Sequence, residues 1–252
     1  MLVVSITALG VGGATAVGAL LGFALKRIPR KYNDAILGFA AGVMLAAAVF
    51  GLIVPALETG GKYIILTVTV GILAGALLLS YLDKVMPHLH NLAGVDIETH
   101  AEGTEKIDKL LLFVLAIAIH NFPEGLAAGV SFGTGDIGNA LVVAGGIALQ
   151  NIPEGMVIIS PLIIAGASGG RALALALATG LVEVVGTFFG YFAVSVSGAI
   201  LPFALAFAGG TMLYVISDEM IPETHSHGFE KSVTFSIIIG FIVVMIMDFY
   251  IR

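Results

Sequence analysis

The stretch LLLFVLAIAIHNFPEGLAAGVSF, residues 110–132, decides the fold, because it is long and apolar enough to cross a bilayer as one helix. Its only formally charged side chain is that of Glu124. The whole chain has the same character: it is 58% hydrophobic and 11% charged, with a mean hydropathy of +1.07. Too few polar side chains remain to cover a water-facing surface, which excludes an ordinary water-soluble enzyme. We expect an all-α, polytopic membrane protein.

The basic residues indicate how the chain is oriented in the membrane. With the N-terminus outside and loops alternating, nine of the 11 Lys and Arg residues fall on the cytosolic side, as the positive-inside rule requires. We expect eight transmembrane helices with both termini outside, in a single domain, residues 1–252. The longest loop, at about residues 83–108, and the next longest, residues 218–231, are then cytosolic. The eight apolar segments are approximately residues 2–25, 35–57, 63–82, 109–132, 139–166, 171–194, 200–217 and 232–250.

Missing residue types restrict the chemistry further. The chain has no cysteine, which excludes disulfides, thiolate metal sites, iron–sulfur clusters and cysteine nucleophiles. A bound metal would need imidazole, carboxylate, amide or thioether ligands. The formal net charge of −6 gives no basic surface, so we expect no nucleic-acid partner.

Three carboxylates, those of Glu124, Glu154 and Glu183, lie well inside apolar segments. Each costs roughly 2.5–3.5 kcal/mol at the centre of a membrane helix, so together they need about 8–10 kcal/mol of compensation. Two of them end matching hexapeptides in consecutive segments: HNFPEG, residues 120–125, and QNIPEG, residues 150–155. Both motifs fall near the midplane of antiparallel helices, so they can face each other.

Within each hexapeptide the first, second and fifth positions share one helical face. His120, Asn121 and Glu124 therefore converge, as do Gln150, Asn151 and Glu154. We expect the two prolines to bend the helices and free a backbone carbonyl beside each glutamate, as is tolerated where backbone lines a cavity. This set of imidazole, carboxylate and amide groups suits Zn²⁺, with Fe²⁺, Mn²⁺, Co²⁺ or Cd²⁺ as other candidates.

Structural explanations compete with the metal hypothesis. An intramembrane glutamate can be protonated or hydrogen-bonded across helices, and a proline can simply kink a helix. Glu183, alone in LVEVVG, is also compatible with a structural or proton-binding role. Met44, in the middle of the second segment, would ordinarily belong to core packing.

The paired hexapeptides, followed by an acidic residue in the next helix, resemble those of the Zrt/Irt-like (ZIP) divalent-metal transporters. The stretch GFAAGVMLAAAVFGLIVPALE, residues 38–58, is similar to their prokaryotic GufA-like branch. The resemblance implies uptake of divalent metal, Zn²⁺ first, by alternating access in the cell (inner) membrane, and a homodimer. It also implies that helices one, four, five and six move together against the other four.

The resemblance implies a two-metal centre bridged by Glu124 and Glu154. The first ligand set would be Met44, His120, Glu124, Gln150 and Glu154, and the second Asn121, Glu124, Asn151, Glu154 and Glu183. Many members have His at the position of Gln150, and GufA-like members can have Asp at that of Asn151. The first site here therefore has one imidazole, and the second has one charge fewer.

Polar residues outside the centre give candidates for the two ends of a pathway. Glu58 and Asp248 lie near the external ends of helices two and eight, where they could attract cations or could simply be solvated helix-end charges. We expect the cytosolic exit to include residues of both cytosolic loops. These are His88, His90, Asp218, Glu219, Glu223, His225 and His227, with His100 as a further loop histidine that could chelate metal.

Two other functions fit parts of the sequence. A midmembrane zinc with a carboxylate could activate water in an intramembrane metallohydrolase, but no H-E-x-x-H motif occurs and the nearby glutamates are needed as ligands. A metal-responsive membrane sensor or a structural subunit would use the cytosolic histidines instead. We favour a transporter that is not an enzyme.

Overall fold

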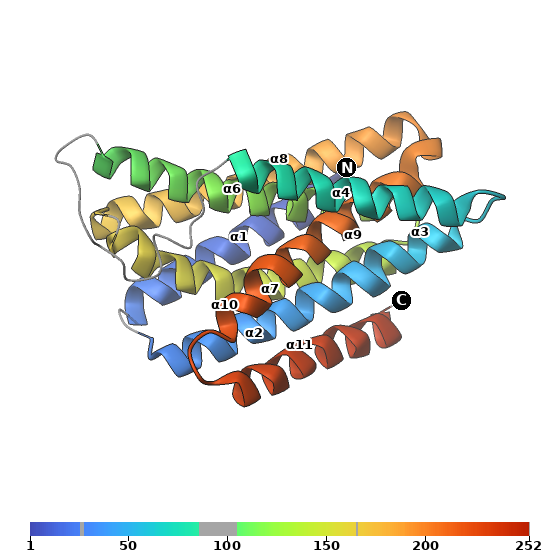
Figure 1. Cartoon of the computed structure of the whole chain (residues 1–252). Coiled ribbons are helices and arrows are strands. Elements are labelled where there is room, and N and C mark those ends of the chain that lie inside the picture. Colours follow the sequence, from blue (N-terminus) through green and yellow to red (C-terminus); the bar gives the residue numbers. More distant parts are fainter. Residues whose placement is uncertain (26–27, 86–104, 165, 252) are drawn as a thin grey trace.

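The computed structural model describes residues 1–25, 28–85, 105–164 and 166–251, with no side-chain detail for residues 85, 105–113 and 116. This part of the chain consists of long helices packed side by side (Figure 1). The helical elements are α1 (Leu2–Leu25), α2 (Arg30–Ala46), η1 (Ala47–Ile53), α3 (Val54–Glu58), α4 (Ile64–Val85), α6 (Glu105–Ser131), η2 (Phe132–Thr134), α7 (Ile137–Ile164), α8 (Gly169–Val196), η3 (Gly198–Ile200), α9 (Leu201–Val215), η4 (Ile216–Met220), α10 (Ile221–Thr224) and α11 (Glu230–Ile251).

In the described ranges seven helical stretches are long and apolar enough to cross a bilayer. They correspond to the predicted segments one to three and five to eight. The fourth segment forms α6, which has 27 residues and begins in the region without side-chain detail. The all-helical, multi-pass architecture is confirmed, and a total of eight crossings stays a prediction.

Two of the long helices contain a π-helical segment. The element η1 joins α2 to α3, and η4 joins α9 to α10, so each pair forms one continuous helix. Single π-helical turns are rare and occur frequently at functional sites. The prediction of a loop over residues 218–231 is wrong for its first half, because the helix continues to Thr224. Pro222 lies in the first turn of α10, directly after η4, where its missing N–H removes one hydrogen bond of the continuous helix.

Close glycine contacts relate the first half of the bundle to the second. A Cβ atom added at Gly12 would collide with the carbonyl oxygen of Gly180, and one added at Gly180 would collide with that of Gly12. The same reciprocity holds for Gly42 against Ile237 and Gly210 against Ile72, at equivalent positions of the two halves. Small residues at these positions let the helix backbones approach closely in a membrane.

The reciprocal contacts define an inverted repeat. Helix α1 packs on α7 as α8 packs on α6, and α4 packs on α9 as α11 packs on α2. The equivalent elements are therefore α1 and α8, α2–η1–α3 and α9–η4–α10, α4 and α11, and α6 and α7. Because consecutive helices cross in alternate directions, the first and sixth run oppositely and the repeat is inverted. The hexapeptides of α6 and α7 occupy equivalent positions in this repeat.

Candidate metal centre

The two hexapeptides lie in α6 and α7, in the interior of the bundle. Pro123 and Pro153 are inside these helices and do not end them. A bend at these prolines stays a prediction, and π-helical backbone is found in η1 and η4. Of the two predicted helical faces, Asn121, Glu124, Gln150 and Asn151 are buried, whereas His120 and Glu154 are partly buried. Glu183 of α8 is buried as well.

Glu183 of α8 accepts hydrogen bonds from three buried side chains. Its Oε1 atom accepts from Asn121 Nδ2 at 2.6 Å and from Thr15 Oγ1 at 2.7 Å. Its Oε2 atom accepts from Asn151 Nδ2 at 2.5 Å. Asn151 Nδ2 also lies 3.1 Å from the carbonyl oxygen of Val11. The network joins α1, α6, α7 and α8, the four helices that the resemblance groups as one moving unit.

Other polar atoms of the centre are buried without a hydrogen-bond partner. They are Glu124 Oε2, both polar atoms of the Gln150 side chain, and Asn151 Oδ1. Buried polar atoms nearly always have partners, so several orphaned ones in one place call for an explanation. The carboxylate of Glu124 interacts electrostatically with those of Glu154 and Glu183, and the Gln150 side chain lies close enough to interact with it. The three oxygens among the orphaned atoms, Glu124 Oε2, Gln150 Oε1 and Asn151 Oδ1, are acceptors that a cation could use.

His120 of α6 contacts a residue that we had placed at the exit. Its Nε2 atom lies 2.9 Å from Glu219 Oε1 on η4, and both side chains are about a quarter exposed. Glu154 interacts electrostatically with both groups. Glu219 therefore reaches the centre itself, across the boundary between α6 and the α9–η4–α10 helix.

Met44 lies in the largest buried cluster, with Ala127 of α6 and Ile147 of α7 as members of the same cluster. Its burial fits both a thioether ligand and core packing. In the described residues, no three His, Asp or Glu side chains come together in a geometry that could hold a metal ion. A centre here therefore depends on the amides of Gln150 and Asn151 and on Met44 as well as on the charged groups.

The candidates for an external entrance lie at helix ends. Glu58 is the last residue of α3 and is exposed, and Asp248 is partly buried in the last turn of α11. The structure places each near its predicted helix end.

The predicted exit residues separate into several small clusters. Asp218 accepts a hydrogen bond from Tyr214 Oη at 3.2 Å, and the same hydroxyl lies 3.4 Å from Asp83 Oδ2. His227 Nδ1 lies 3.3 Å from Oδ1 of the buried Asp34 at the start of α2. His225 Nδ1 contacts the carbonyl oxygen of Ile221 at 2.9 Å.

The remaining exit candidates contribute less. Glu223, on α10, is partly buried, and its backbone carbonyl accepts a hydrogen bond from Ser226. His88, His90 and His100 lie outside the described residues.

Four contacting residues were missed by the sequence analysis. They are Thr15, Asp34, Asp83 and Tyr214. A threonine hydroxyl within an apolar helix carries no specific signal, because it can bond to its own helix backbone. Asp34 and Asp83 stand at segment ends, where solvated charges are ordinary.

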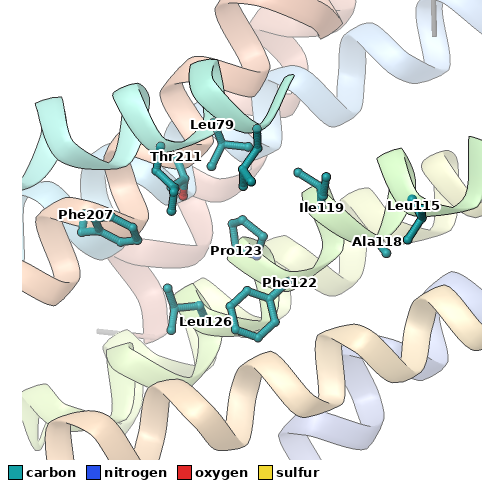
Figure 2. Close-up of a pocket in the computed structure, with 11 residues that line it drawn as sticks. Leu79, Leu115, Ala118, Ile119, Phe122, Pro123, Leu126, Phe207 and Thr211 are labelled. Carbon is teal, nitrogen blue, oxygen red and sulfur yellow. The ribbon is translucent and has the colours of Figure 1, made fainter. Parts of the chain in front are cut away.

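An apolar cavity of about 260 Å³ lies beside the centre, between α4, α6 and α9. Figure 2 shows Phe122 and Pro123 of α6 facing Leu79 of α4 and Thr211 of α9 across it. Pro123 immediately precedes Glu124. The lining is too apolar to bind a cation, so the cavity is a gap in packing between α6 and its neighbours.

Comparison with known proteins gives similarities along nearly the whole chain. A family model described as "ZIP Zinc transporter" matches residues 98–248. The chain is 44% identical over 243 residues to "Zinc transporter GufA" of Myxococcus xanthus, with 94% of each chain covered. It is 40% identical over 243 residues to "Zinc transporter ZIPB" of Bordetella bronchiseptica, with 93% of this chain and 77% of that protein covered. With "Zinc transporter ZIP11" of Homo sapiens it shares 34% identity over 319 residues, covering 94% of this chain and 93% of the other.

Proposed function

The chain belongs to the ZIP zinc transporter family, and on this premise we propose that it carries a divalent cation, Zn²⁺ first, into the cytoplasm. The orphaned polar atoms between α6 and α7 are the observation that carries the proposal. Glu124, Gln150 and Asn151 each hold a buried side-chain oxygen without a hydrogen-bond partner. A cation between these helices would satisfy them and would offset the cost of burying Glu124 and Glu154 in the membrane.

The ligand set supports Zn²⁺ without limiting transport to it. Met44, His120, Glu124, Gln150 and Glu154 offer one thioether, one imidazole, two carboxylates and one amide oxygen. Zn²⁺ accepts nitrogen and oxygen ligands readily, and Cd²⁺, Fe²⁺, Mn²⁺ and Co²⁺ tolerate the same set. The ion is the cargo of the protein, so the site has to release it as well as bind it.

Transport proceeds by alternating access around this site. In an inverted repeat, the two halves can exchange conformations and open opposite sides in turn. The apolar cavity beside Leu79, Ile119 and Thr211 leaves room between α6 and its neighbours α4 and α9, which supports movement of α6 at this boundary.

The contact between His120 and Glu219 lies on the boundary between α6 and the α9–η4–α10 helix. It joins α6 to η4, so it links the moving unit to the rest of the bundle. Movement of α6 past η4 separates these two side chains. Glu219 then becomes the first carboxylate that a cation leaving the centre meets on its way to Asp218 and the cytosol.

The protein works in the cell (inner) membrane, crosses it eight times with both termini outside, and forms a homodimer. Nine of the 11 basic residues fall on the cytosolic side in this orientation. In Figure 1 the N and C ends both lie toward the end of the bundle where α3 meets α4, as an even number of crossings requires. Glu58 and Asp248 then lie at the external side, where their charge would draw cations to the entrance.

Flux of Zn²⁺ into liposomes containing the purified protein tests the proposal. The wild-type chain should give saturable uptake, and the double variant Glu124→Ala plus Glu154→Ala should give none. The matched control is Glu230→Gln, which removes a carboxylate at the exposed start of α11. Uptake that the double variant leaves unchanged would overturn the proposal, as would a wild-type protein that moves neither Zn²⁺ nor Cd²⁺. Cleavage of a membrane substrate without ion flux would favour the metallohydrolase instead.

A further inference from the structure

Glu183 stands apart from the other intramembrane carboxylates, because its hydrogen-bonding capacity is already used. Three donors, Thr15 Oγ1, Asn121 Nδ2 and Asn151 Nδ2, lie 2.5–2.7 Å from its two oxygens. Glu124, by contrast, keeps one oxygen without a partner. Hydrogen bonds to a carboxylate are among the strongest in proteins. Three of them provide the compensation that a bound cation would otherwise supply.

The position of this network in the inverted repeat explains its composition. Thr15 and Glu183 are equivalent residues of α1 and α8, separated by 168 positions, and they contact each other. Asn121 and Asn151 are equivalent residues of α6 and α7. If the repeat were exact, α8 would have a threonine at the position equivalent to Thr15. It has Glu183 instead, and this one carboxylate accepts hydrogen bonds from both Asn121 and Asn151.

The hydrogen bonds to Glu183 leave an amide oxygen free to bind a cation. In a carboxamide the nitrogen donates and the oxygen only accepts, so an amide whose nitrogen bonds to Glu183 keeps its oxygen available. Asn151 Oδ1 is indeed buried with no hydrogen-bond partner. Glu183 thereby fixes which face of the amide is offered as a ligand.

A single divalent cation balances the two negative charges of Glu124 and Glu154. The three hydrogen-bond donors stabilise Glu183 without a second cation.

We propose that Glu183 is a positioning residue in this chain, and that the centre binds a single divalent cation. This inference rests on the proposed function. Glu183 holds Asn121 and Asn151, with Thr15 as its own support, and ties α1, α6, α7 and α8 into one rigid unit. The family resemblance implies two cations, but the second is not needed here. Asn151 donates a hydrogen bond to Glu183, whereas an aspartate at position 151 would repel Glu183 unless the two carboxylates shared a cation.

Cd²⁺ bound at equilibrium, measured by dialysis and elemental analysis, tests the count. Cd²⁺ held elsewhere on the protein is removed by subtracting the value for Glu124→Gln plus Glu154→Gln. By this difference the wild type should bind one Cd²⁺ per chain, and Glu183→Gln should keep it. Asn151→Asp, which replaces an amide donor to Glu183 by a second carboxylate that needs a shared cation, should bind two. Two cations in the wild type, with the second lost in Glu183→Gln, would overturn the proposal, as would a single cation in Asn151→Asp.

Transport kinetics test the positioning role. Thr15→Val removes one hydrogen bond to Glu183 with little change in shape, so we expect KM for Zn²⁺ to rise about tenfold at nearly unchanged maximal rate. Thr15→Ser keeps the hydroxyl and should restore KM to within about twofold. A Thr15→Val protein with wild-type KM would contradict the role of Thr15 as support. If the wild type shows no flux and the difference in bound Cd²⁺ is zero, the proposed function itself fails, and this inference with it.

Discussion

Replacing Gly12 by Ala tests the close packing of α1 on α8, on which the central network depends. A Cβ atom at Gly12 would lie 2.9 Å from Cγ2 of Val184 and still closer to the carbonyl oxygen of Gly180. The backbone oxygen cannot rotate away, so the two helices would have to separate by about 1 Å to restore ordinary contact. Gly13, one residue along the same helix, has nothing within 4 Å of the equivalent position, so it is the matched control.

The expected difference in stability between Gly12→Ala and Gly13→Ala excludes the gain in helix propensity, because both variants share it. Both replacements gain roughly 0.5–1 kcal/mol in helix stability from Gly to Ala. Only Gly12→Ala suffers overpacking, which costs about 1–3 kcal/mol. A central value of about 2 kcal/mol corresponds to a Tm lower than that of Gly13→Ala by roughly 4–8 °C.

The assay is thermal unfolding of the purified variants in detergent, followed by loss of the monodisperse peak in size-exclusion chromatography. Zn²⁺ uptake should fall together with stability in Gly12→Ala, because Thr15 lies one helical turn further along α1. Equal Tm values for the Gly12 and Gly13 variants would refute the reciprocal packing of the two halves.

Three further predictions concern the centre and its surroundings. Glu219→Gln removes a charged, partly exposed partner of His120, so we expect the initial rate of Zn²⁺ uptake to change by about three- to tenfold. Glu223→Gln, on the following turn, is the control. Equal uptake rates in the two variants would contradict a role for the contact between His120 and Glu219. Gln150→His adds a second imidazole to the site, so half-saturation for Zn²⁺ should occur at a lower concentration in uptake assays, and an unchanged value would argue against Gln150 as a ligand. Ala118→Phe fills part of the cavity of about 260 Å³ between α4, α6 and α9. If this cavity closes during the transport cycle, the variant should keep its Tm and lose most of its Zn²⁺ uptake. A variant with normal uptake would show that the cavity does not close.

The fold follows from the sequence because membrane helices obey simple rules. Apolar length places the spans, and the positions of Lys and Arg supply an orientation. The predicted face shared by Asn121 and Glu124 is found buried in α6, and that of Gln150 and Asn151 in α7. Sequence spacing is informative here because i, i+3 and i+4 positions coincide on any helix, whatever its neighbours.

Contacts between distant helices were beyond such rules. The pairing of His120 with Glu219 spans 99 positions, and it depends on the continuation of α9 through η4. Neither a π-helical turn nor the hydrogen bond from Thr15 to Glu183 leaves a periodic pattern in the sequence. Helices α6 and α7 both continue through Pro123 and Pro153, so these prolines do not end the helices, and a bend at them stays a prediction.

Anomalous scattering from crystals grown with Cd²⁺ tests the central claim most directly, because it locates the ion without reference to activity. The account predicts a peak between α6 and α7, in contact with the carboxylates of Glu124 and Glu154 and with the amide of Gln150. The peak should be absent in crystals of the Glu124→Ala plus Glu154→Ala variant. Cd²⁺ bound only at the cytosolic histidines, with nothing between the two hexapeptides, would contradict the account.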